Sequence, residues 1–336
     1  MHFNSAATST IPRGVWVLGF VSLLMDISSE MIHSLLPVYL VTVMGASALL
    51  VGVIEGVAES TTMVVKVFSG ALSDYLGKRK ALAVFGYGLG AISKPFFAMA
   101  GSTGMVFGAR FVDRIGKGIR GAPRDALVAD LVSPESRGAA YGLRQSLDTV
   151  GAFSGPLLAV GLMLLWANDF QAVFWVAVIP AALAVALLYF GVAEPEKASE
   201  GGAKPPINWR AFRSLSRDYW WVVGIGSAFA LARFSEAFLV LRVQQAGLSV
   251  AWAPLVLIVM NLVFALSAYP FGRLSDRMSH TRLLFLGLAV LVVADLFLAW
   301  GESWQALLPG ILLWVCTWAL PRGCFPPWWQ QLHWQV

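Results

Sequence analysis

Charged residues are scarce in this sequence of 336 residues, and their scarcity excludes a soluble protein. Asp, Glu, Lys and Arg make up 13% of the chain, whereas a soluble domain carries about 25%. Hydrophobic residues make up 58%, and the mean hydropathy is +0.71. This composition is typical of a protein that crosses a membrane many times.

Cysteine and histidine are also rare, with two and four residues respectively. The two cysteines do not have metal-ligand spacing inside the hydrophobic repeats, and no glycine-rich loop ends in Lys-Ser or Lys-Thr as a phosphate-binding loop would. We therefore expect no catalytic residue, no metal site and no cofactor. An ATP-driven pump is not supported either, so an ion gradient must supply the energy for transport.

Apolar stretches of roughly 20 residues, the length that crosses a hydrocarbon core, recur along the chain and predict about ten membrane spans. Their ranges are 16–41, 50–73, 81–100, 104–124, 139–163, 171–193, 219–242, 251–272, 282–300 and 305–320. The N-terminal segment is short and polar and leads directly into the first span, so we expect no cleaved signal peptide.

Basic residues alternate between the predicted turns and indicate the orientation, because Lys and Arg in short loops stay on the cytoplasmic side. The turns after spans 2, 4, 6 and 8 contain Lys or Arg, whereas the turns after spans 1, 3, 5 and 9 contain none. This pattern predicts a cytoplasmic N-terminus. It also explains the net charge of +5 without a nucleic-acid partner.

A short polar motif occurs twice and indicates an internal repeat. Residues 70–74 read Gly-Ala-Leu-Ser-Asp after the second span, and residues 272–276 read Gly-Arg-Leu-Ser-Asp after the eighth. A Ser-Glu pair also recurs, at Glu30 in the first span and Glu236 in the seventh. Two copies of one six-span unit are therefore expected. The predicted domains are an N-terminal six-helix bundle (1–194), a cytoplasmic linker (195–218), an incomplete C-terminal bundle of about four helices (219–320) and an aberrant tail (321–336).

The first copy of the motif resembles the cytoplasmic loop pattern of the major facilitator superfamily, Gly-x-x-x-Asp-x-x-Gly-basic-basic. Gly70, Asp74 and Gly77 hold the diagnostic positions, and the resemblance extends over residues 14 to about 313. It implies an all-α polytopic membrane protein with the major facilitator fold. That fold has two six-helix inverted-repeat halves, here with only about ten transmembrane helices, and a substrate site near the membrane midplane.

The same resemblance implies gating roles for charged residues near the cytoplasmic side. Asp74 and its second copy, Asp276, would latch the outward-facing state; the alternative is a turn that only fixes topology. Arg114 begins the spacing Arg-x-x-x-Gly-x-x-x-Ala in span 4, and its depth favours a buried pairing role. The other basic residues nearby are expected to snorkel to the cytoplasmic interface, namely Lys117, Arg120 and Arg124.

Span 5 contains Gly151-x-x-x-Gly155-Pro156, which resembles a motif of antiporters and drug exporters in this superfamily. Pro156 is expected to bend the helix, and the two glycines to permit tight packing. The copy departs from the full pattern at Ala159 and Val160, where two glycines would stand. This motif favours export by proton exchange over uptake.

Ionisable residues inside the predicted spans cost roughly 2.5 kcal/mol or more each unless they are paired or hydrated, so we expect them to face a central cavity. Candidate proton carriers are Asp26, Glu30 and Glu59, because a carboxylate in a low-dielectric cavity titrates nearer to neutral pH. Candidate cavity or substrate residues are His33, Glu55, Lys66, Lys94, Arg233 and Glu236. The alternative is internal salt bridging, for instance of Glu55 or Glu59 with Lys94.

These features predict a secondary active transporter that exports a small organic molecule by proton-coupled alternating access. The alternatives are a proton symporter for uptake and a damaged relative without transport activity. The expected partners are a small-molecule substrate, protons and the lipid bilayer, with no nucleic acid. We expect a monomer in a bacterial inner membrane.

The segment from Trp314 onward differs in composition from the rest of the chain. It holds both cysteines, five of the fourteen tryptophans and three prolines. Codons read in a shifted frame from Trp314 restore the internal repeat. We therefore hypothesise that a frameshift truncated span 10 and removed spans 11 and 12. The alternative is a genuine tryptophan-rich tail at the membrane interface.

Overall fold

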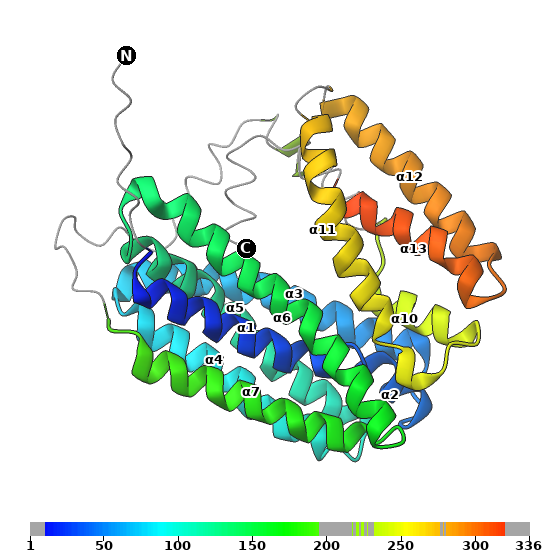
Figure 1. The fold of residues 1–336 in the computed structure, drawn as a ribbon, viewed down its shortest axis with the longest axis horizontal. Coiled ribbons are helices and arrows are strands. Elements are labelled where there is room, and N and C mark those ends of the chain that lie inside the picture. Colours follow the sequence, from blue (N-terminus) through cyan, green and yellow to red (C-terminus); the bar gives the residue numbers. More distant parts are fainter. Residues whose placement is uncertain are drawn as a thin grey trace.

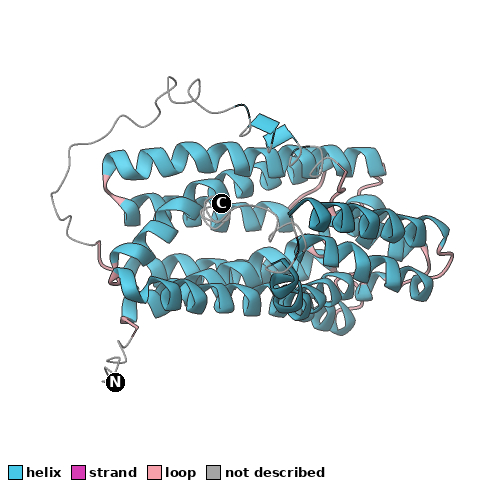
Figure 2. Cartoon of the chain, turned by 90° about the horizontal axis from the view of Figure 1, so that it is seen from above, coloured by secondary structure: helices cyan, strands magenta, loops and turns pink. Residues whose placement is uncertain are grey.

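The structure is a computed structural model that describes residues 11–194, 232–275, 278 and 280–319, together with 217, 220, 221, 223, 224 and 227. The described residues are mostly helical and contain no β-strand, as Figure 2 shows. Some predicted features lie outside the described residues: Asp276, the tail 321–336 and nearly all of the linker 195–218.

The N-terminal part of the chain forms a bundle of long helices joined by short turns (Figure 1). In chain order these are α1 (Arg13–His33), α2 (Leu36–Thr42), α3 (Ala48–Leu76), α4 (Arg79–Ala98), α5 (Thr103–Asp130), the 3₁₀ turn η1 (Pro134–Ser136), α6 (Arg137–Leu165) and α7 (Phe170–Gly191). Helix α1 lies against α6 and α7, while α5 packs against α3 and α4. The side chains of Ser47, Ser102 and Asp169 accept backbone N–H bonds and so fix where α3, α5 and α7 begin.

The first predicted span is divided in two. Helix α1 ends at His33, and α2 begins at Leu36 after a turn at Ser34 and Leu35. Pro37 explains the break, because it has no N–H to donate to the carbonyl of His33 and its ring crowds the preceding turn. The last turn of α1 is therefore free to present its polar side chains to neighbouring helices.

The described C-terminal part consists of helices that form a smaller, tilted group (Figure 1). They are α10 (Glu236–Gln245), the 3₁₀ turn η2 (Val250–Trp252), α11 (Leu255–Ser275), α12 (His280–Trp300) and α13 (Trp304–Ala319). Arg242 joins α10 to the end of α12, because its Nε donates to the carbonyl of Leu298 at 3.1 Å and its Nη2 to that of Gly301 at 2.8 Å. Two bonds to backbone carbonyls satisfy a charged side chain that would otherwise be costly to bury.

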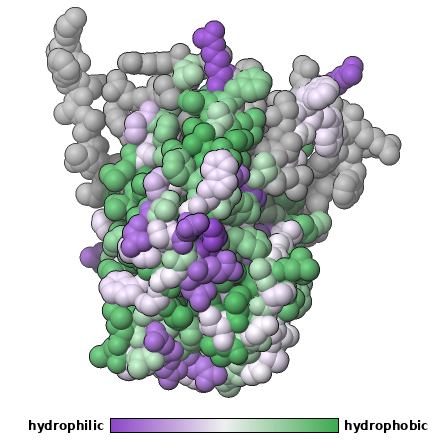
Figure 3. All heavy atoms as spheres, turned by 90° about the vertical axis from the view of Figure 1, so that its right-hand side faces the viewer, coloured by the Kyte–Doolittle hydropathy of each residue, from purple (hydrophilic) through white to green (hydrophobic). Residues whose placement is uncertain are grey.

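Six of the described helical segments are long and apolar enough to cross a membrane. They are Arg13–Thr42, Ala48–Leu76, Arg79–Ala98, Arg137–Leu165, Phe170–Gly191 and Val250–Ser267, and two shorter apolar helices are Phe285–Trp300 and Trp304–Thr317. Helix α5 is as long as the others but carries many charged residues. Hydrophobic side chains cover much of the face seen in Figure 3, with hydrophilic side chains in small clusters among them.

The two parts of the chain meet at one end of the molecule. The larger buried cluster contains Leu36, Tyr39, Val240 and Leu257, so it joins residues of both parts. The second cluster is confined to the N-terminal bundle. Helix α10 contacts α2 and α3, and α11 contacts α6, whereas the opposite ends of α11 and the N-terminal bundle diverge (Figure 1). The described helices of the two parts therefore contact each other at the end that carries the uncharged turns.

Candidate functional site

Two glycines of α6 bring this helix unusually close to α1. A Cβ atom added to Gly151 would lie 2.7 Å from the carbonyl oxygen of Leu23, and one added to Gly155 would lie 2.7 Å from the Cβ of Glu30. A side chain at either position would therefore push the helices apart. The polar residues of α1 are held in place against α6 by this contact.

A buried ion pair between Lys94 and Asp113 joins α4 to α5 and also contacts α1. The Nζ of Lys94 lies 2.8 Å from Oδ1 of Asp113 and donates to Oγ of Ser29 at 3.0 Å. The side chain of Lys94 is fully buried, and that of Asp113 is 2% exposed. Ser29 belongs to the repeated Ser-Glu pair, so one residue of that pair anchors α1 to the ion pair.

Two further ion pairs link α3 to α5. Arg110 Nη2 lies 2.5 Å from Glu55 Oε2, and Arg114 Nη1 lies 2.8 Å from Glu59 Oε1. The suggested pairing of Lys94 with Glu55 or Glu59 is therefore wrong. The reason is that Asp113 occupies the face of α5 next to α4, whereas both arginines reach toward α3.

His33, the last residue of α1, connects these pairs to Glu30. Its Nε2 lies 3.5 Å from Oδ2 of Asp113, and its Nδ1 lies 3.8 Å from Oε1 of Glu30. Nη2 of Arg114 lies 3.0 Å from Nδ1 and 3.2 Å from Nε2. The imidazole thus stands between a carboxylate that is 27% exposed and one that is almost completely buried.

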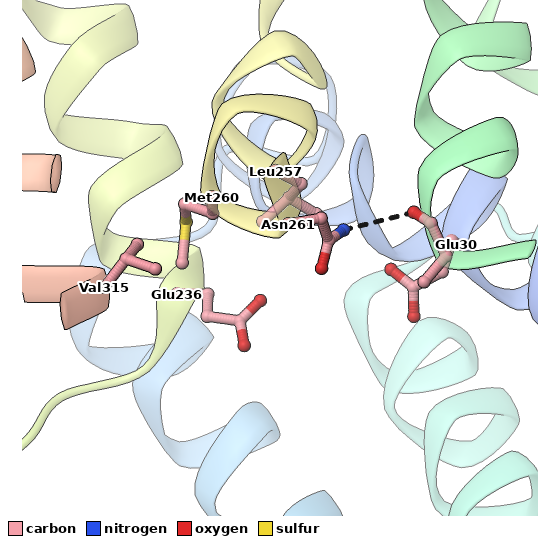
Figure 4. A pocket seen from close by; sticks show the side chains of 7 residues that line it. Glu30, Glu236, Leu257, Met260, Asn261 and Val315 are labelled. Carbon is pink, nitrogen blue, oxygen red and sulfur yellow. Dashed lines mark hydrogen bonds between the residues drawn. The ribbon is translucent and has the colours of Figure 1, made fainter. Parts of the chain in front are cut away.

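A cavity of about 110 Å³ lies between the two parts of the chain, next to Glu30. It is lined by Glu30, Ala152, Glu236, Leu257, Met260, Asn261 and Val315 (Figure 4). The two glutamates of the repeated Ser-Glu pair, 206 residues apart in number, therefore line one cavity from opposite sides. The remaining lining residues on α11 and α13 are mostly apolar.

Pro156 explains how α11 is attached to α6 at this cavity. In a regular helix the N–H of residue 156 would donate to the carbonyl of Ala152, but proline has no N–H. Nδ2 of Asn261 donates to this carbonyl at 3.2 Å, the bond drawn in Figure 4. Because the amide nitrogen is held there, the amide oxygen of Asn261 points into the space between the two glutamates (Figure 4).

Of the predicted proton carriers and cavity residues, only Glu30 and Glu236 line this cavity; His33, Glu55, Glu59 and Lys94 belong to the ion-pair network beside it, and the other three have contacts of their own. Asp26 lies one turn before Glu30 on α1 and packs against Gly151. Lys66 lies on α3 against Gly121 of α5. The guanidinium of Arg233 stacks over the ring of Trp314, 5.2 Å from its centroid.

Three of the predicted gating residues, Gly70, Asp74 and Gly77, lie at the far end of α3. Gly77 ends the helix with a φ of 62°, a left-handed conformation that glycine adopts without strain. Oδ1 of Asp74 lies 3.6 Å from Nη2 of Arg79, and the Asp74 side chain is 75% exposed. Gly70 faces Ala122 of α5, where an added Cβ would be 3.4 Å away.

The expected snorkelling of Arg120 and Arg124 is wrong. Arg120 is 4% exposed and stacks over the ring of Tyr87, 4.9 Å from its centroid. Nε of Arg124 lies 3.1 Å from Oδ1 of Asp125. These side chains turn toward the bundle because aromatic and acidic partners lie there, whereas Lys117 is exposed.

Sequence reasoning assigned no site role to Asp113, Arg110 or Asn261. For the first two, their position on the same face of α5 as Arg114 was the available signal. For Asn261, the available signal was only that it is a polar residue within an apolar span. Among the described residues, no group of three or more His, Cys, Asp or Glu side chains is placed to hold a metal ion.

Comparison with known proteins identifies the family. The family model of the Major Facilitator Superfamily matches residues 18–333. An uncharacterized MFS-type transporter of Methanocaldococcus jannaschii is 30% identical over 329 residues, which cover 95% of this chain and 80% of that protein. The multidrug resistance protein MdtH of Photorhabdus laumondii is 30% identical over 162 residues, or 48% of this chain and 39% of that protein.

Solved structures share the fold. A bacterial homologue of the human lysosomal transporter Spinster, in an inward-facing and occupied conformation, has a TM-score of 0.74 at 17% identity and covers 96% of this chain and 76% of its own. A D-xylose-proton symporter has a TM-score of 0.66 at 17% identity and covers 96% and 84% respectively. The chain is therefore an all-α, multi-pass membrane protein that belongs to the major facilitator superfamily of secondary transporters.

Proposed function

We propose that this transporter exports a small organic molecule in exchange for protons by alternating access. The observation that carries the proposal is the position of Glu30. It lines the cavity between the two halves and also lies 3.8 Å from His33, which contacts the buried Asp113. A carboxylate shared between a cavity and a buried polar network can gain or lose a proton as the cavity changes its contents.

Glu59 and Asp26 are proposed as further proton carriers. The Glu59 side chain is 51% exposed while it pairs with Arg114, which supports proton exchange at this carboxylate. Asp26 lies one helical turn from Glu30 on α1. Glu55, by contrast, is buried against Arg110 at 2.5 Å, and we assign it a structural role.

A motif in α6 supports our proposal that the protein exports its substrate. Gly151, Gly155 and Pro156 form the motif that resembles those of exporters, and each has a defined contact at the α1–α6–α11 junction. The partial similarity to a multidrug resistance protein supports the same direction. We propose a monomer in a bacterial inner membrane with a cytoplasmic N-terminus, because the basic turns then lie in the cytoplasm.

Alternating access requires a latch that differs between states, and we propose that Asp74 supplies it. In this state Asp74 is exposed and contacts only the nearby Arg79 among the ion pairs of the described residues. Asp74→Asn is expected to reduce transport about tenfold while leaving membrane insertion intact. Normal flux through Asp74→Asn would leave the motif with a topological role only.

Flux across proteoliposome membranes tests the proposed function. The protein is reconstituted with an imposed pH gradient, a panel of organic cations, anions and zwitterions is offered, and proton movement is recorded with a pH-sensitive dye. We expect substrate and proton fluxes in opposite directions, and we expect Glu30→Gln or Glu59→Gln to uncouple them. Fluxes in the same direction would favour a symporter. Absence of flux with every compound would favour a relative without transport activity.

A further inference from the structure

Three hydrogen-bond acceptors converge on the cavity from three helices. They are the carboxylates of Glu30 on α1 and Glu236 on α10, and the amide oxygen of Asn261 on α11 (Figure 4). The amide cannot turn its donor group to the cavity without breaking the bond to the carbonyl of Ala152. These groups therefore favour a ligand that donates hydrogen bonds.

The charges around the cavity also favour a cation. The carboxylates of Glu55, Glu59 and Asp113 each have an arginine or lysine partner within 2.8 Å. Among the described residues, neither Glu30 nor Glu236 forms an ion pair with an arginine or lysine, and the ion-pair partner of Glu30 is His33 at 3.8 Å. A monovalent cation between the two carboxylates would therefore supply the positive partner that arginine and lysine supply to the other glutamates.

The rest of the cavity wall is apolar. Leu257, Met260 and Val315 line it on the side of the C-terminal half. An inorganic ion would leave these side chains facing unfilled space, whereas the hydrocarbon body of an organic cation would pack against them. Glu30 and Glu236 come from different halves, so a ligand that contacts both would bridge the halves.

We propose that the cavity binds a protonated organic amine, whose ammonium group donates hydrogen bonds to Glu30, Glu236 and the amide oxygen of Asn261. This inference rests on the proposed transport function and names the substrate class of that site. Asn261 is the fixed acceptor, because Pro156 leaves the Ala152 carbonyl free to hold its amide nitrogen. The two glutamates supply the charge.

The test is calorimetric binding to the full chain in lipid nanodiscs. The probes are phenethylammonium, 3-phenylpropionate as a carboxylate of similar shape, and sodium as a competitor. We expect phenethylammonium to bind, 3-phenylpropionate not to bind, and sodium at equal concentration not to displace the amine. Glu30→Gln and Glu236→Gln should each weaken binding roughly tenfold or more, because each removes a charge-assisted hydrogen bond.

Glu302→Gln is the matched control, since Glu302 is an exposed residue in the turn between α12 and α13 and the substitution changes the net charge equally. It should leave the affinity unchanged. Circular dichroism and size-exclusion profiles establish that each variant is folded. Lack of phenethylammonium binding, equal binding of the carboxylate, displacement by sodium, or wild-type affinity in both glutamate variants would each overturn the proposal.

The experiments can contradict the proposed ligand class and the proposed transport function separately. Amine binding without flux in proteoliposomes would overturn the proposed transport function while the cavity retains its ligand class. Flux of some other compound, with no amine binding, would overturn the ligand class and leave the transport function standing.

Discussion

Asp113 interacts with three cationic or titratable side chains inside the N-terminal bundle. Its carboxylate lies 2.8 Å from Lys94, 3.5 Å from His33 and 3.8 Å from Nε of Arg114. One negative charge thus faces cationic or titratable groups from α1, α4 and α5 itself. Such a pair stabilises the fold only while both charges remain, because an uncompensated buried charge is very costly.

Removal of one partner from the pair between Lys94 and Asp113 should therefore cost more than removal of both. We expect Lys94→Met to lower the free energy of unfolding by about 3–5 kcal/mol. The double variant Lys94→Met/Asp113→Leu should recover at least half of this loss. Titration of the purified protein from mild detergent into denaturing detergent measures both.

The exposed pair between Arg79 and Asp130 provides the control for this prediction. These side chains are 25% and 37% exposed, so solvent screens their interaction and Arg79→Met should change stability by about 1 kcal/mol or less. Equal losses for Lys94→Met and Arg79→Met would show that burial does not amplify the pair. A double variant as unstable as the sum of its two single variants would contradict the expected compensation.

The sequence was sufficient to place ionisable residues inside spans but not to pair them. The alternative of internal salt bridging named Glu55 or Glu59 as the partner of Lys94, which pairs with Asp113 instead. Helical spacing shows which residues share a face of one helix, but the partner depends on which faces of two helices meet. That information comes from packing, here from Gly86 of α4, where an added Cβ would lie 2.6 Å from the backbone of Arg120 on α5.

Helix α6 is the element that joins the N-terminal bundle to the C-terminal half. One of its faces uses glycines to approach α1, and Pro156 exposes a carbonyl to α11. Both features were visible in the sequence as Gly-x-x-x-Gly-Pro, but their partners were not. The division of the first span after His33 was also missed, although Pro37 is a sequence signal for it.

The close approach of α1 and α6 can be tested with a single methyl group. Gly155→Ala places a Cβ 2.7 Å from that of Glu30 and 2.8 Å from the carbonyl of Ile27. The helices must separate, and we expect a loss of about 1–3 kcal/mol in stability. Gly161→Ala on the same helix meets no atom within 4 Å.

Gly161→Ala should therefore be neutral or stabilising by up to about 1 kcal/mol, since alanine favours the helix more than glycine does. The melting temperatures of the two variants, measured in the same detergent, test this prediction. If both variants melt at the same temperature, the spacing of α1 and α6 is not limited by Gly155.

The bond between Asn261 and Ala152 should depend on Pro156. In the variant Pro156→Ala the new N–H can donate to the Ala152 carbonyl within α6, so Asn261 would lose or share its acceptor. Asn261→Leu should then cost less in this background than in the native chain. A double-mutant cycle on the free energy of unfolding should give a coupling of about 0.5–1.5 kcal/mol; a coupling near zero would mean that the proline does not hold the asparagine.

At the scale of the whole molecule, the described helices of the two halves contact each other at one end and diverge at the other (Figure 1). Phe238 of α10 fits against Gly52 of α3, where an added Cβ would lie 2.8 Å from Cζ of the ring. This contact belongs to the end with uncharged turns. The cavity at Glu30 and Glu236 also lies between the halves, so we expect this contact to open when a ligand leaves through that end.

A covalent cross-link between the two halves at this contact should therefore stop transport. In a background with Cys316 and Cys324 replaced by serine, we introduce Gly52→Cys and Phe238→Cys and treat the pair with a short bifunctional methanethiosulfonate. We expect flux of a compound carried by the untreated protein to fall at least tenfold and to return with reducing agent, because the halves can then separate again.

The control is a cross-link inside the N-terminal bundle, made with the same reagent between Val17→Cys on α1 and Gly191→Cys on α7. An added Cβ at Gly191 lies 2.8 Å from Cγ1 of Val17, so the two side chains are adjacent. Alternating access moves one half against the other and leaves each half nearly rigid. The control pair should therefore retain most of its flux when cross-linked. Undiminished flux through the sealed pair of Gly52→Cys and Phe238→Cys would show that this end of the molecule does not open during transport.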